Sequence, residues 1–127
     1  MAPLLLVTRP QPEADITAAR ARQAGFRALV APLLEIRALV PPPLDRWPDA
    51  LLLTSARTAA LAATAYPALK GSIPTYAVGP ATAEAARAAG VAVAGEGAAD
   101  GQAALALAQD HIHILHLRGE DGAPLSP

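Results

Sequence analysis

The stretch Tyr76–Glu96, which reads YAVGPATAEAARAAGVAVAGE, decides the fold of this chain. It begins with a short β-prone run, Tyr76–Val78, and continues into Ala81–Ala89, which consists almost entirely of good helix formers. Gly90 then stops the helix, and Val91–Ala94 returns to an apolar, extended run. The pattern predicts a strand, a helix and a second strand, with a helix long enough for a right-handed crossover between parallel strands.

The turn inside this stretch has a chemical consequence. Gly79-Pro80 separates the strand from the helix, and Thr82 falls in the first helical turn. The N–H groups of a first turn have no partners within the helix, and the helix dipole is positive at this end. We therefore expect the backbone N–H groups and the Thr82 hydroxyl to form an anion site beyond the end of the strand.

The same alternation of strand and helix recurs along the chain. A parallel, doubly wound sheet covered by helices is the expected result. Gly95-Glu96-Gly97 is expected to form a loop, followed by Asp100 as a helix N-cap. The strands are expected at 4–8, 26–30, 50–53, 73–78, 91–94 and 112–117, and the helices at 12–25, 57–65, 81–89 and 102–109.

The segment 31–40 departs from this rhythm. It alternates apolar and charged residues, which predicts a half-exposed strand that leaves one compact unit. Pro41-Pro42-Pro43 follows as a stiff linker, so we place a domain boundary between Leu39 and Pro48.

Composition excludes several classes of protein. The chain is 53% hydrophobic and 17% charged, which favours a buried parallel sheet over disorder. A net charge of −1 gives no basic footprint for nucleic acid, and the absence of cysteine excludes disulfides and thiolate metal sites. Leu4–Val7 is too short for a secretion signal and no run is long enough to cross a membrane, so we expect a cytoplasmic protein.

Polar residues gather where the expected strands end. In a parallel sheet these ends share one edge, where ligands bind. Each hydroxyl or glycine could merely cap a helix, but the set, with three arginines, favours an anionic ligand. The strand ends are Thr8-Arg9, Thr54–Arg57, Val78–Thr82 and Leu117–Gly119.

Three further features of the sequence give no support for a metal site, a dinucleotide site or a serine nucleophile. On a strand, His111 and His113 would share a face and His116 would point the other way, so we expect no metal site. Gly95-x-Gly97-x-x-x-Gly101 has the wrong spacing for a dinucleotide fingerprint. Ser55 lies outside any G-x-S-x-G motif and is a poor nucleophile candidate.

Taken together, several stretches resemble the uroporphyrinogen-III synthase family. They occur in the family's order over nearly the whole chain. The stretches are LLLVTRP from Leu4, APLLEI from Ala31, LLLTSAR from Leu51, YAVGPATAEAARAAG from Tyr76 and LHLRGEDG from Leu115.

The resemblance implies an α/β fold with doubly wound parallel sheets (flavodoxin-like), arranged as two domains with substrate between them. Here one domain would be near-complete and the other represented by its first βαβ segment. Residues 1–38 would form the first segment of a discontinuous domain plus a linker strand, and residues 39–127 a second domain that lacks its last elements. A full-length member would be a monomer.

The implied activity is that of a lyase (a hydro-lyase) without metal or organic cofactor. The enzyme closes hydroxymethylbilane, a linear tetrapyrrole with eight carboxylates, into uroporphyrinogen III. It inverts the last ring through a spiro intermediate and releases water, in the biosynthesis of heme and other porphyrins. The resemblance assigns no general acid in this chain.

Matching motifs carry over a set of substrate-binding residues. Ser55 and Arg57, in the TSAR stretch, and Gly79 and Thr82, in the VGPATA stretch, would contact substrate carboxylates, largely through backbone N–H groups. Arg9 and Arg118 would flank the cleft.

Members of the family are considerably longer than this chain. We therefore expect that the chain alone does not make uroporphyrinogen III, and that residues 1–37 lack sheet partners and promote self-association. Two alternatives stay open. One is a non-catalytic regulatory module of the same fold that binds a tetrapyrrole or another anion. The other is a receiver-like or flavodoxin-like domain, which would have acidic strand ends.

Overall fold

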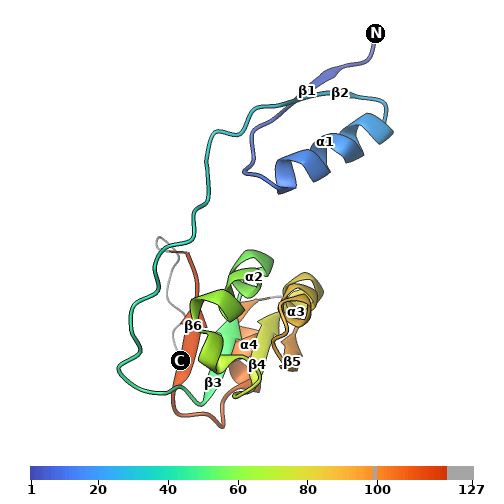
Figure 1. Cartoon of the computed structure of the whole chain (residues 1–127). Coiled ribbons are helices and arrows are strands. Elements are labelled where there is room, and N and C mark those ends of the chain that lie inside the picture. Colours follow the sequence, from blue (N-terminus) through green and yellow to red (C-terminus); the bar gives the residue numbers. More distant parts are fainter. Residues whose placement is uncertain (99, 120–127) are drawn as a thin grey trace. The chain divides into compact units, whose positions relative to one another are not determined.

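The computed structural model describes residues 1–98 and 100–119 and divides the chain into two compact units. Unit 1 is Met1–Leu39 and unit 2 is Val40–Pro127. Each unit has its own parallel sheet, with two strands in unit 1 and four in unit 2 (Figure 1). The last letters of the LHLRGEDG stretch lie outside the described residues.

Unit 1 is a single strand–helix–strand element. Strand β1 (Leu4–Val7) and strand β2 (Arg27–Val30) run parallel and are joined by helix α1 (Glu13–Gln23). Alanines on α1 pack against the side of the sheet that carries Val7. The chain leaves α1 through Gly25, whose φ of +88° is the left-handed conformation that suits glycine after a helix.

One face of the unit 1 sheet is uncovered. Side chains alternate along a strand, so Leu4 and Leu6 point away from the face of Val7 and α1. Leu6 pairs with Leu29, and these three leucines are more than half exposed. A two-stranded sheet with one bare apolar face is marginal as an independent core.

The expectation of a strand at 31–40 is wrong. The segment contains no strand, and nearly all of its residues are exposed. A strand requires a partner for its backbone N–H and C=O groups. Only the start of the segment has such a partner in the backbone of the described residues, since Ala31 and Leu33 donate their N–H groups to the carbonyls of Val7 and Thr8. The alternation of apolar and charged residues therefore did not suffice to make a strand.

Unit 2 contains four parallel strands in the order β5-β4-β3-β6. Strand β3 (Ala50–Leu53) lies in the interior, and all four of its residues are buried. It pairs with β4 (Thr75–Val78) on one side and with β6 (Ile114–Leu117) on the other, while β5 (Val93–Gly97) extends the sheet beyond β4.

Burial of β3 on both faces requires helices on both sides of the sheet. Helices α2 (Ala56–Ala65) and α3 (Gly79–Ala88) pack against each other and enclose Leu51 and Leu53, whereas α4 (Gly101–Leu107) packs on β4 and β5 (Figure 1). The connection from β5 to β6 runs back across the sheet, opposite to the earlier crossovers. A right-handed crossover in that direction places its helix on the other face. The unit therefore has the winding expected of a doubly wound α/β fold.

The expectation that Gly95-Glu96-Gly97 forms a loop is wrong, because these residues belong to β5. A Cβ on Gly97 would lie 2.7 Å from the backbone nitrogen of Ala104 in α4. A Cβ on Gly95 would lie 2.9 Å from the ring of Tyr76. Both glycines allow close packing on β5, which is one of the positional uses of glycine within a strand.

Several element boundaries also differ from expectation. Gly79-Pro80 are the first residues of α3 rather than a separate turn, since proline is tolerated in a first helical turn. Strands β4, β5 and β6 each begin two residues later than expected. Asp100 is confirmed as an N-cap, because its carboxylate accepts the N–H of Ala103 at 2.8 Å. Gly90, with φ +80°, follows α3 as expected.

Candidate functional site

The strand order of unit 2 reverses next to β3. The chain winds from β3 through β4 to β5 in one direction and then returns to the opposite side of β3 as β6. In open α/β sheets such a reversal leaves a crevice at the carboxyl ends of the two strands involved, and ligands bind there. The carboxyl ends of β3 and β6 lead into Thr54-Ser55 and Arg118-Gly119, so two of the predicted strand ends come together at this point.

A side-chain hydrogen bond joins the two strands at this position. Thr54 Oγ1 lies 3.1 Å from Nε2 of His116, and the contact is partly buried. His116 pairs with Leu52 across the strands, so it points to the face opposite to Leu51 and Leu53. Alternation along the strand places Thr54 on the same face, and Arg118 follows His116 by two residues.

Sequence reasoning missed His116 as a member of this site. It treated the three histidines as one group and rejected them together as metal ligands. The adjacency of β3 and β6 is the missing information, because it places His116 beside the TSAR stretch.

His116 is the histidine whose protonation the environment disfavours. Burial, and secondly the positive charge of Arg118, lower its pKa from the usual value of 6.5. The ring is therefore neutral at pH 7. A neutral imidazole beside an arginine can accept or donate a hydrogen bond without adding charge repulsion to the site.

Ser55 caps α2. Its Oγ accepts the N–H of Thr58 at 3.2 Å and lies 3.0 Å from the Thr58 hydroxyl. The cap accounts for the serine side chain and orients the first turn of α2 toward the carboxyl edge. Arg57 lies in this turn and is half-buried.

Gly79 and Thr82 occupy the first turn of α3, at the carboxyl end of β4. Gly79 has φ +75°, and a Cβ there would meet no atom within 4 Å, so conformation rather than space requires glycine. Thr82 is 5% exposed. A ligand at this end would therefore meet mainly the backbone of the turn, and the Thr82 side chain offers it little surface.

The three arginines do not share one edge as expected. Arg57 and Arg118 belong to unit 2, whereas Arg9 follows β1 in the separate sheet of unit 1. Arg9 Nη1 donates to the Thr17 hydroxyl at 3.0 Å. A pocket lies at the same end of the unit 1 strands, and it is lined by Gln11, Pro32, Leu33, Leu34, Glu35 and Ile36.

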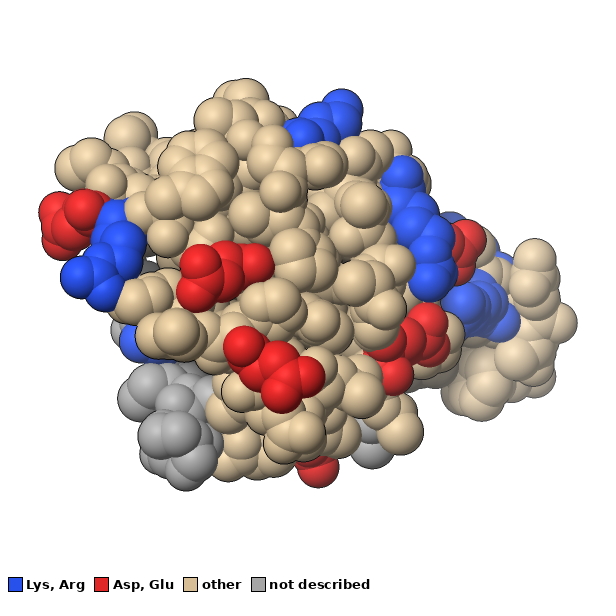
Figure 2. All heavy atoms as spheres, turned by 90° about the horizontal axis from the view of Figure 1, so that it is seen from below, with Lys and Arg blue, Asp and Glu red and all other residues tan. Residues whose placement is uncertain are grey.

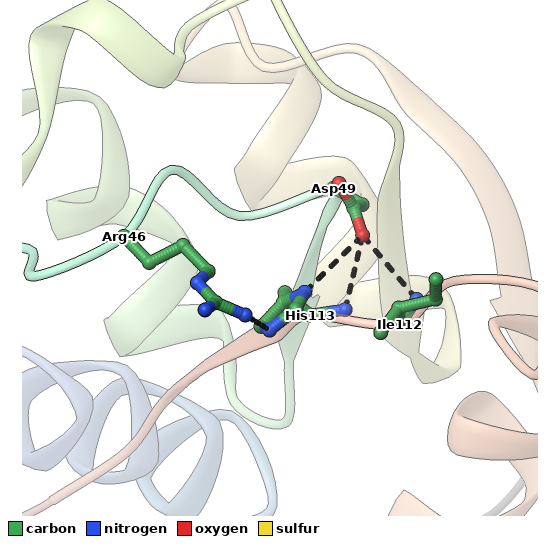
Figure 3. A network of polar contacts seen from close by, with 4 residues as sticks. All are labelled: Arg46, Asp49, Ile112 and His113. Carbon is green, nitrogen blue, oxygen red and sulfur yellow. Dashed lines mark hydrogen bonds and ion pairs between the residues drawn. The ribbon is translucent and has the colours of Figure 1, made fainter.

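The other two histidines lie at the amino end of β6, before the strand begins, so the expectation that they share a strand face is wrong. His113 contacts Arg46 through Nε2 and lies 3.7 Å from Asp49 through Nδ1 (Figure 3). Asp49 also accepts the N–H groups of Ile112 and His113, at 3.3 and 3.0 Å, and so fastens β6 to the start of β3. His111 contacts the Tyr76 hydroxyl at 3.0 Å.

Each histidine thus has its own protein partner, and the described residues contain no group of three or more histidine and carboxylate side chains suited to a metal. Figure 2 shows acidic and basic side chains interspersed on the face in view, with much of that face formed by other residues. Within 1–98 and 100–119, no helix is long and apolar enough to span a bilayer.

The site combines helix N-termini, hydroxyls and an arginine at the switch point of a parallel sheet. This combination is typical of a doubly wound α/β protein, a class in which ligands bind at the carboxyl edge of the sheet. A family model described as uroporphyrinogen-III synthase HemD matches residues 15–125, and the chain belongs to this family of tetrapyrrole-biosynthesis enzymes. A search of curated proteins found no match.

Proposed function

We propose that the chain serves the reaction of uroporphyrinogen-III synthase, in which hydroxymethylbilane is cyclised with inversion of the last ring and loss of water. The family match over residues 15–125 is the observation that carries this proposal. The arrangement at β3, β4 and β6 supports it, because hydrogen-bond donors gather there without a large positive charge. A polycarboxylate bound by several such donors is held in one orientation.

In this mechanism the protein acts mainly by positioning. The first turns of α2 and α3, with Ser55 and Gly79, bind substrate carboxylates through backbone N–H groups, and Arg57 and Arg118 pair with further carboxylates. Thr82 supports the α3 turn from within the core. Holding the two ends of a flexible tetrapyrrole together lowers the entropic barrier to cyclisation, because binding has already restricted the freedom of the ligand. The proposed reaction uses no cofactor, and we expect it to take place in the cytoplasm.

Unit 1 limits what the chain does alone. Its sheet has two strands, and its bare face exposes three leucines. We propose that residues 1–38 are the first segment of a larger domain and that residues 39–127 form the second. A core of this size needs further strands to hold Arg9 in a fixed position. The chain by itself self-associates and does not make uroporphyrinogen III.

The test is an assay of product isomers. Hydroxymethylbilane closes without ring inversion unless an enzyme directs it, so the ratio of inverted to non-inverted uroporphyrinogen reports catalysis directly. We expect the 127-residue chain to leave this ratio close to that of the uncatalysed reaction. Addition of a separately produced segment that completes unit 1 should raise it. Efficient inversion by the chain alone, in a monomeric state by light scattering, would contradict the proposal.

A binding module without catalysis is the second candidate. It is favoured by one observation, which is that the proposed anion-binding groups all belong to unit 2 and need nothing from unit 1. These groups are the first turns of α2 and α3, Thr54, His116 and Arg118. If tetrapyrrole binds to unit 2 and the completed protein still yields no inverted product, this second function is the correct one.

A further inference from the structure

His116 lies at the carboxyl edge of the sheet, and three features of its position suit a ligand-binding residue. It is half-buried, it is fixed by the Thr54 hydroxyl, and it lies at the point where the strand order reverses. A hydroxyl can donate to a neutral ring nitrogen and can also accept from a protonated one. Thr54 can therefore hold the imidazole in place in either charge state.

We propose that His116 is a carboxylate-binding residue that takes up a proton when a polycarboxylate occupies the ends of β3 and β6. This inference rests on the proposed function, because it assumes that the anion bound there is a tetrapyrrole carboxylate. It assigns a role to His116, which lies in the LHLRGEDG stretch but was not among the expected substrate-binding residues. It also makes substrate affinity depend on pH through a single ring.

The charges around His116 favour such a response. Arg118, two residues further along, disfavours a second positive charge when the site is empty. Strand β3 carries no charged residue, and neither does α4, which reads GQAALAL. Arg57 belongs to α2, which contacts β6 and covers the face of Leu51 and Leu53, opposite to His116. Among the described residues, no carboxylate on these elements stabilises the imidazolium, so a bound carboxylate is the group that can supply the missing negative charge.

The sign of the effect follows from this arrangement. In the empty site the pKa of His116 lies below 6.5, so the ring is neutral at pH 7. A carboxylate placed between the imidazole and Arg118 favours the charged form and raises the pKa. Binding then takes up a proton, and by linkage the affinity increases as the pH falls through the interval between the empty-site and occupied-site pKa values. The propionate and acetate groups of the tetrapyrrole have pKa values of about 4–5, so they stay ionised over most of that interval.

The three histidines allow one decisive experiment on the intact chain. Nuclear magnetic resonance of the imidazole Cε1–H groups gives the pKa of each ring, with and without uroporphyrin III as the probe. We expect the probe to raise the pKa of His116 by about one unit. By linkage, the probe then binds the protein with a protonated His116 about tenfold more tightly than the protein with a neutral His116. His111 and His113 lie at the amino ends of the strands and serve as internal controls, because the probe should leave their imidazole signals unchanged.

A matched pair of variants separates the ring from the rest of the site. His116→Gln should abolish the increase in uroporphyrin affinity at lower pH, whereas His113→Gln should retain it. If uroporphyrin perturbs the amides of Ser55 and Gly79 while the pKa of His116 stays constant, the inference is wrong and the proposed function stands. If the amides of the carboxyl edge do not respond at all, the inference and the proposed site both fail. The wild-type titration decides the matter even if a variant folds poorly.

Discussion

Replacing Gly97 by alanine is expected to lower the free energy of unfolding of the chain by about 2–3 kcal/mol, the upper part of the range for overpacking. The added Cβ would lie 2.7–2.9 Å from the backbone nitrogen, Cα and Cβ of Ala104. Both Gly97 and Ala104 are buried, and the obstructing atoms include helix backbone, which cannot turn aside as a long side chain would. Helix α4 must therefore move away from β5.

Urea denaturation followed by circular dichroism measures this loss. Gly119→Ala is the matched control, because a Cβ there meets no atom of the described residues within 4 Å and its φ lies outside the left-handed range. The control should stay within about 0.5 kcal/mol of the wild type. Equal stability of the Gly97 and Gly119 variants would show that α4 does not pack on β5 as described.

A second pair of substitutions separates backbone strain from ligand binding. Gly79 and Gly71 have φ values of +75° and +71°, and a Cβ added at either glycine would meet no atom within 4 Å. Alanine at either position should cost about 1–2 kcal/mol of stability, because an L side chain is disfavoured in this conformation. The two glycines differ in place, since Gly79 begins α3 at the carboxyl end of β4 and Gly71 precedes the amino end of β4.

Only the Gly79 variant should bind uroporphyrin more weakly, by about tenfold, which corresponds to about 1.4 kcal/mol and to the loss of one charge-assisted hydrogen bond. Fluorescence titration of both variants under conditions where both stay folded gives the comparison. A parallel loss of affinity in the Gly71 variant would mean that stability, rather than the orientation of the α3 turn, controls binding.

Local chemistry explains which parts of the fold could be predicted from the sequence. The Ala-rich helices, the positive-φ glycines that end α1 and α3, and the Asp100 cap depend on neighbouring residues alone, and they were predicted close to their observed positions. The parallel arrangement followed from the alternation of strands and helices.

Errors arose where a residue depends on distant partners. Gly95 and Gly97 resemble loop residues, yet they lie in β5 because Tyr76 and Ala104 require the space. The segment 31–40 resembles a strand, yet only Ala31 and Leu33 at its start bond to the backbone at the end of β1 and just after it, and the described structure has no strand there.

The same contrast between local and distant partners applies to the residues of the candidate site. Ser55, Gly79 and Arg118 could be proposed because each lies within two residues of the end of an apolar strand. His116 was missed because its significance depends on Thr54, 62 positions away in the sequence. The contacts of His113 with Asp49 and with Arg46 were missed for the same reason.

The central claim is that the carboxyl edge of unit 2 binds a polycarboxylate. Its most direct test is a map of backbone amide shifts in the intact chain on titration with uroporphyrin III. The account predicts the largest changes at Ser55–Arg57, Gly79–Thr82 and Arg118-Gly119. Changes centred on Asp49 and Ile112-His113 at the opposite ends of the strands, or no changes in unit 2, would contradict it.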